Sequence, residues 1–186
     1  MAEPSMTFWE HLEELRWSIF RIAIAAVMAM VVIFIFMPSM FTGFVLGPTT
    51  SEFFLYKWLG SLGQLPFLPD FAAGDFKVDI ISINVASQFM THISTSIWFA
   101  LVAIFPYIIY EIWKFIAPAL YDNEKGSVRA AFLFGTLMFF IGCAISYSFI
   151  FPFTFRFLTE YQISGQITNQ ISLNSYMSTF LGMVFI

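Results

Sequence analysis

The chain has 186 residues, of which 59% are hydrophobic, 20% are aromatic and only 11% are charged. Soluble domains are about 25% charged and about 45–50% apolar, so a soluble globule with this composition lacks the polar residues to cover its surface. A net charge of −4 and a single cysteine argue against a basic nucleic-acid-binding protein and a disulfide-stabilised scaffold. The composition predicts an all-α, polytopic membrane protein.

Long stretches without Asp, Glu, Lys or Arg locate the membrane helices. They cover residues 22–51, 80–110, 130–155 and 161–186. About 20 helical residues cross the roughly 30 Å hydrocarbon core of a bilayer. Together with the flanking prolines and charges, these stretches predict three complete membrane-spanning helices, over residues 18–37, 93–116 and 129–152.

The remaining segments complete a single membrane domain over residues 1–186. Residues 173–186 are too few to span a bilayer, so they are either an interfacial segment or the start of a fourth helix. The apolar run LGMVFI at their end leads us to favour a sequence truncated within that helix. The connections are an extracytoplasmic loop over 38–92, a cytoplasmic turn over 117–128 and an outer loop over 153–172. In the first loop, SEFFLYKWLGSLG predicts a short helix in the membrane interface, and KVDIISINVAS predicts an extended segment.

Residues 1–17 predict an amphipathic helix on the inner membrane surface that leads into the first span. Thr7 and Glu10 form a T-x-x-E capping pattern, and apolar residues then recur at helical spacing. The leader is acidic where a signal peptide is basic. With a cytoplasmic N-terminus, five of the eight Lys and Arg residues lie inside and three outside, which the positive-inside rule favours.

The sequence offers little for catalysis or metal binding. His11 and His92 are far apart in sequence and belong to no metal-ligand spacing, and no nucleotide-binding or serine-nucleophile motif is present. The predicted spans carry scattered Ser and Thr, which commonly hydrogen bond within or between membrane helices. We therefore predict no enzymatic activity, no cofactor and no metal.

Two carboxylates at the cytoplasmic edge are better candidates for a binding site. Glu14 lies four residues after Glu10 of the capping pattern, and Glu124 lies in the turn between the second and third spans. If the two converge beside the aromatic inner end of the second span, they form a receptor for a pair of cations next to an apolar segment. Arginine suits such a site because its planar fork engages a carboxylate with two hydrogen bonds.

Other residues at this edge have simpler interpretations. Trp113 and Tyr110 suit the aromatic belt of a membrane interface. Glu111 and Lys114 are spaced to pair on one helix. Glu124 itself also favours the start of the third helix through the helix dipole, and Glu14 can equally be a solvated charge.

Three features of the sequence together resemble a known family. HLEELR matches the pattern H-L-x-E-L-R, the run PYIIYEIWKFIAPALY over 106–121 matches P-x-x-x-Y-x-x-W-x-F-x-x-P-A-L, and Glu124 follows at the expected spacing. INVASQFM and FIGCAISYSFIFPFTFRFL are weaker matches. These motifs resemble TatC, the multispanning signal-peptide receptor subunit of the twin-arginine protein translocase.

The resemblance implies a fold of six membrane helices in a concave, glove-like wall, of which this chain supplies three and the start of a fourth. It implies that Glu14 and Glu124 hold the two arginines of a signal peptide, with Phe115 and Leu15 beside the apolar part of its motif. The supporting residues would be Arg16, which pairs with a carboxylate, and Pro48, Trp113 and Pro118.

The resemblance also implies a setting in the bacterial cytoplasmic (inner) membrane. The partners would be twin-arginine signal peptides of folded cargo, single-span TatA- and TatB-type subunits, and further copies of the chain. Transport would be driven by the proton-motive force. The alternative is a subunit of a small channel or transporter, which the absence of ionisable residues from the predicted mid-membrane segments disfavours.

Overall fold

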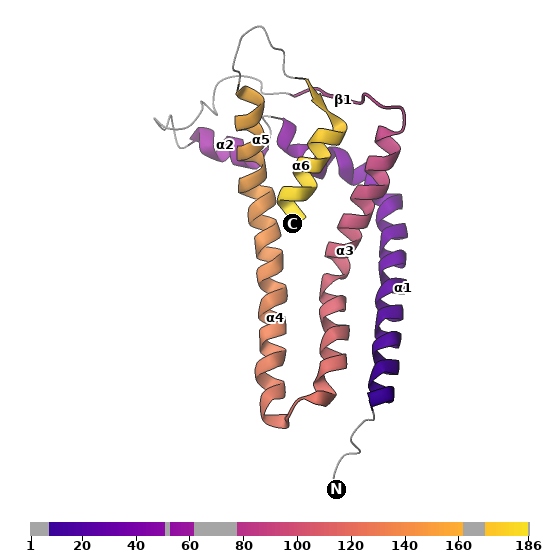
Figure 1. Ribbon diagram of the computed structural model, residues 1–186. Helices are drawn as coiled ribbons and strands as arrows, with labels where there is room; N and C mark the ends of the chain where they lie inside the picture. The colour runs from indigo at the N-terminus through magenta and orange to yellow at the C-terminus, as the bar shows by residue number, and fades with distance from the viewer. Residues whose placement is uncertain (1–7, 51–52, 62–77, 162–169, 186) are drawn as a thin grey trace.

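The computed structural model describes residues 8–50, 53–61, 78–161 and 170–185, which are mostly helical (Figure 1). Within these residues, three helical segments are long and apolar enough to cross a membrane: Trp9–Thr49, Ser87–Ala119 and Asp122–Thr159. The predicted all-α membrane fold class is therefore confirmed. Thr7 of the predicted capping pattern and residues 62–77 of the first outer loop lie outside the described residues.

The α-helices in chain order are α1 (Phe8–Met40), α2 (Phe54–Ser61), α3 (Ser87–Ile116), α4 (Asp122–Ile145), α5 (Phe151–Glu160) and α6 (Leu173–Phe185). Short turns of π or 3-10 helix join them: η1 (Phe41–Val45), η2 (Gly47–Thr49), η3 (Ala117–Ala119) and η4 (Ser146–Ile150). Two-residue strands β1 (Ile80–Ile81) and β2 (Ile171–Ser172) pair in parallel. The start of α1, η3 and the start of α4 lie together at what we call the N-terminal end of the bundle, opposite α2 and α5 (Figure 1).

The long helices run past the prolines that the sequence suggests as boundaries. α1 contains Pro38 and continues through the π-helical turn η1, while α4 continues through the π-helical turn η4 into α5, whose first turn holds Pro152. A proline in a first turn needs no N–H donor, and π turns accommodate local breaks in the hydrogen-bond ladder. Helical structure consequently extends to Glu160, beyond residue 152.

α1 and α3 run antiparallel and are joined at three levels (Figure 1). At the N-terminal end, the ring of His11 stacks on Phe115 with 4.2 Å between centroids. Further along, Arg21 contacts Glu111, and near the opposite end the ring of Phe34 stacks on His92 at 3.9 Å. These contacts establish which residues of the two helices face each other.

The His92 side chain also satisfies a backbone group that Pro38 leaves without a partner. Pro38 has no N–H, so the carbonyl of Phe34, four residues earlier, lacks its usual α-helical donor. Nε2 of His92 lies 2.9 Å from that carbonyl oxygen and donates to it. The α3 residue thus stabilises the proline-containing part of α1.

We expect the variant His92→Phe to lower the free energy of unfolding by about 1 kcal/mol, because the ring stack is retained while the Phe34 carbonyl loses its donor. In a Pro38→Ala background the helix supplies its own N–H, so the same change should cost less. Denaturation of the four proteins in detergent measures this double-mutant cycle. An equal cost in both backgrounds would contradict the assigned role.

An aromatic core lies at the end of the bundle away from the N-terminus, where α6 packs against α3, η4 and α5. Phe151, Tyr176 and Phe180 are fully buried there, and the Phe151 and Phe180 rings meet edge to face at 5.0 Å. The hydroxyl of Tyr176 donates to the carbonyl of Val45. This core joins α6 and the connecting turns to the long helices.

The short helix predicted in the first outer loop is present as α2. Its Leu55 and Tyr56 side chains are buried, whereas Phe54 and Trp58 are 52% and 54% exposed. One face of α2 therefore packs on the protein and the other presents aromatic rings outward, as expected for a helix in a membrane interface.

Candidate functional site

The structure places the residues singled out by the sequence at two ends of the molecule. Most lie at the N-terminal end: Glu14, Leu15 and Arg16 on α1, Trp113 and Phe115 on α3, Pro118 in η3 and Glu124 in the first turn of α4. Pro48 lies at the opposite end in η2. α3 contacts both α1 and α4, so the helices that carry Glu14 and Glu124 flank it.

The turn that carries Glu124 to this end follows from local chemistry. Pro118 lies in η3, and Leu120 and Tyr121 are extended, so the chain leaves α3 and starts α4 within a few residues. Asp122 and Glu124 occupy the first turn of α4, where negative charge favours the unpaired N–H groups and the helix dipole. The Glu124 side chain is exposed.

A polar cluster joins α1 to α3 beside these residues. Arg21 donates from Nε to Oε2 of Glu111 at 3.0 Å, and its Nη2 lies 2.9 Å from the same oxygen. The hydroxyl of Tyr107 donates to the other oxygen of Glu111, Oε1, at 3.0 Å. Nη2 of Arg21 also donates to Oγ of Ser18 at 2.9 Å. Both oxygens of the Glu111 carboxylate are thereby occupied.

Burial makes this cluster an important helix-to-helix contact. The side chain of Glu111 is only 4% exposed, and that of Arg21 is 35% exposed. A buried carboxylate is tolerated when it is paired and hydrogen bonded, and removal of its cation leaves an uncompensated charge. The Arg21–Glu111 pair is therefore a buried polar contact between α1 and α3, in addition to the two ring stacks.

Glu111 has a different partner from the one that its sequence spacing suggests. The spacing of Glu111 and Lys114 permits a pair on one helix, but among the described residues Glu111 forms its ion pair with Arg21, from a different helix. Sequence reasoning also missed Arg21 and Tyr107. One signal was available, because Arg21 and Glu111 are opposite charges just inside the predicted spans 18–37 and 93–116.

The other charges at this end separate into paired and unpaired groups. Arg16 lies 3.6 Å from Glu13 on its own helix, and Lys125 lies 2.7 Å from Asp122 in the first turn of α4. Arg16 therefore pairs within α1, and Arg21 makes the contact to α3. By contrast, Glu14 and Glu124 make no side-chain hydrogen bond or ion pair within the described part of the chain.

Apolar side chains lie at the same end of the bundle as the unpaired carboxylates. Leu15 is 36% exposed, and Phe115 is half-buried and stacks on the ring of His11. Trp113 packs edge to face on Phe132 of α4 at 6.1 Å, which joins α3 to α4. The N-terminal end thus combines free negative charge with accessible apolar surface.

At the opposite end, Pro48 has a buried position in the connecting turns. Its carbonyl oxygen lies 3.0 Å from the hydroxyl of Tyr56, which also lies 3.0 Å from the carbonyl of Pro152. The guanidinium of the buried Arg156 lies 5.4 Å from the centre of the Tyr56 ring. Pro48 is therefore part of the packing between η2, α2 and α5.

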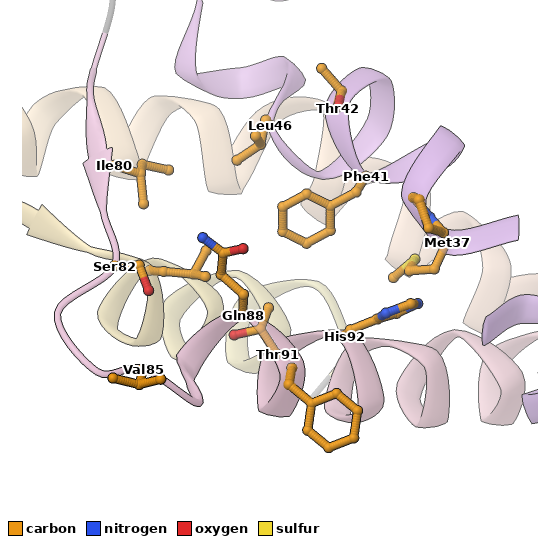
Figure 2. A pocket seen from close by; sticks show the side chains of 13 residues that line it. Met37, Phe41, Thr42, Leu46, Ile80, Ser82, Val85, Gln88, Thr91 and His92 are labelled. Atoms are coloured by element: carbon orange, nitrogen blue, oxygen red, sulfur yellow. The ribbon is translucent and has the colours of Figure 1, made fainter. Parts of the chain in front are cut away.

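The opposite end also holds a cavity of about 660 Å³ between α1, η1, β1 and α3. Figure 2 shows Gln88 and His92 of α3 pointing toward Phe41 and Met37 across it. None of the thirteen described lining residues is Asp, Glu, Lys or Arg. The described residues also contain no group of three His, Cys, Asp or Glu side chains placed to hold a metal ion.

Three apolar helices, with an interhelical ion pair near one end, define a multi-pass α-helical membrane protein. The chain belongs to the TatC family, because the family model described as "Sec-independent protein translocase protein (TatC)" matches residues 10–186. The family predicted from the motifs is thereby confirmed.

Comparisons with individual relatives support membership in the TatC family. The TatC protein of Haemophilus influenzae is 31% identical over 98% of this chain and 61% of its own length. The TatC protein of a Blattabacterium is 29% identical over 95% of this chain and 67% of its own length. A crystal structure described as the twin arginine translocase receptor TatC in DDM superposes with a TM-score of 0.69 at 24% identity, over 95% of this chain and 68% of that one. The chain thus spans about two thirds or less of the length of these proteins.

Proposed function

We propose that the chain is the signal-peptide-binding part of a Sec-independent protein translocase, and that Glu14 and Glu124 bind the two arginines of a twin-arginine motif. One observation carries the proposal: among the described residues these two carboxylates at the N-terminal end have no hydrogen-bonded cation, while Glu13, Glu111 and Asp122 are already paired. An incoming guanidinium supplies the missing partner through charge-assisted hydrogen bonds.

The surroundings of the carboxylates suit the rest of such a peptide. Leu15 and the exposed Leu12 offer apolar contact on α1, and the half-buried Phe115 lies behind His11. A peptide with two arginines beside an apolar segment matches this surface in charge and polarity. No catalytic step or cofactor is part of the proposal.

The proposal also covers the membrane location of the chain, its partner subunits and the energy source for transport. The N-terminal end would face the cytoplasm of a bacterial inner membrane, where cargo signal peptides first arrive. TatA- and TatB-type subunits and further copies of the chain would then assemble around the loaded receptor. Transport would use the proton-motive force. The channel or transporter alternative is less favoured, because the ion pair within the helices lies near one end and its members neutralise each other.

The test is binding of a labelled Arg-Arg signal peptide, beside its Lys-Lys counterpart, to the chain in lipid nanodiscs. We expect the Arg-Arg peptide to bind at least about tenfold more tightly, because lysine cannot form the two-pronged contact. Raising the salt concentration should weaken binding, since the carboxylates are accessible to solvent. Equal affinity for the two peptides would contradict the proposal.

A further inference from the structure

We propose that Glu111 keeps Arg21 away from Glu14, and so leaves Glu14 available to the arginine of a signal peptide. This inference rests on the proposed function. It makes Glu111 a positioning residue that acts through Arg21, with no contact to the peptide.

The direction of the Arg21 side chain brings it toward Glu14. Helical side chains lean toward the N-terminus of their helix, and Nη2 of Arg21 donates to Ser18, three residues earlier. Glu14 lies a further turn along the same face, because residues seven apart are separated by almost two turns and about 10.5 Å. Extended Arg and Glu side chains together can span that separation.

The packing of α1 on α3 supports the same placement. The His11–Phe115 stack lies on one side of Glu14 and the Arg21–Glu111 pair on the other. Glu14 is partly exposed between these two levels. Glu14 also contributes an electrostatic attraction at the Arg21 guanidinium, in addition to the stronger attraction of Glu111.

Glu111 and Glu14 therefore both attract Arg21, but of these two carboxylates Arg21 forms hydrogen bonds only with Glu111. Glu111 binds Arg21 through two nitrogen atoms and is buried, which makes it the stronger partner. If Glu111 loses its charge, Glu14 becomes the remaining carboxylate that attracts Arg21 in the described part of the chain. An intramolecular arginine competes well with a peptide, because its effective concentration is high.

The experiment compares Arg-Arg peptide binding to the wild type, E14Q, E111Q and the double variant E111Q/R21M in nanodiscs. We expect E111Q to weaken binding about tenfold, close to the loss in E14Q, because Arg21 then occupies Glu14. The double variant should bind within about twofold of the wild type, since methionine keeps the apolar stem of Arg21 without its charge. Tyr107→Phe is the matched control: it removes a donor to Glu111 but leaves the ion pair, and should bind normally.

Two results would overturn the inference. Normal binding by E111Q would show that Arg21 does not capture Glu14, and equally weak binding by E111Q and the double variant would show a merely structural loss. If E111Q fails to fold in detergent, Glu111→Asp replaces it, with a smaller loss expected that R21M again reverses. Equal binding by E14Q and the wild type would instead refute the role of Glu14 in the proposed function.

Discussion

The double variant E14Q/E124Q is expected to bind an Arg-Arg signal peptide about 100-fold more weakly than the wild type. Each carboxylate contributes a charge-assisted contact worth about tenfold in affinity, and the two sites lie on different helices, so their effects should add. Glutamine keeps the size and hydrogen-bonding capacity of the side chain and removes the charge. A fluorescent peptide titrated onto nanodiscs measures the loss.

The chain provides a matched control for this experiment. Glu13 and Asp122 are close in sequence to Glu14 and Glu124 but already have cations, Arg16 and Lys125. The variant E13Q/D122N therefore removes the same amount of charge from the same end, and should bind within about threefold of the wild type. Equal losses in the two double variants would mean that binding depends on general charge and not on Glu14 and Glu124.

Replacement of Phe180 by alanine is expected to lower the free energy of unfolding by about 3–5 kcal/mol, which is typical of a buried phenylalanine. Phe180 is fully buried on α6, and its ring meets Phe151 at 5.0 Å and Tyr147 at 6.3 Å. The variant leaves a cavity at the junction of α6, η4 and α5. Denaturation in detergent, followed by tryptophan fluorescence, measures the change.

Phe157 supplies the comparison for this prediction. It belongs to α5, next to the same core, but its side chain is 50% exposed. Phe157→Ala should therefore change the free energy of unfolding by less than about 1 kcal/mol. If the two variants lose the same amount, the aromatic core at the end away from the N-terminus does not stabilise the fold as described.

Much of the fold follows from sequence because the bilayer restricts the choices. An apolar stretch of about 20 residues that crosses the bilayer satisfies its own backbone hydrogen bonds as a helix, so all three long helices were predictable. The effect of single prolines was less predictable. Pro38 and Pro152 suggest helix ends, but His92 satisfies the Phe34 carbonyl and η4 precedes Pro152, so helical structure continues. These compensations depend on other segments and are invisible in a local pattern.

For the candidate site, too, the sequence predicted some features and not others. Spacing and the TatC motifs identified Glu14 and Glu124 as charged residues that lie at the same end of the bundle. They did not reveal which acids already have partners, because that depends on the register of α1 against α3. Arg21 could pair with Glu14 on its own helix or with Glu111 on α3, and only the three-dimensional packing selects Glu111. Among the described residues, the fold thus pairs Arg21 with Glu111 and leaves Glu14 without an ion pair.

The most direct test of the receptor proposal is photo-crosslinking of a signal peptide that carries a photoreactive residue beside its two arginines. We expect crosslinks to α1 near Glu14 and to the first turn of α4 near Glu124, and we expect both to disappear with the Lys-Lys peptide. Crosslinks that are the same for both peptides, or that map only to the cavity lined by Gln88 and His92 at the opposite end, would contradict it.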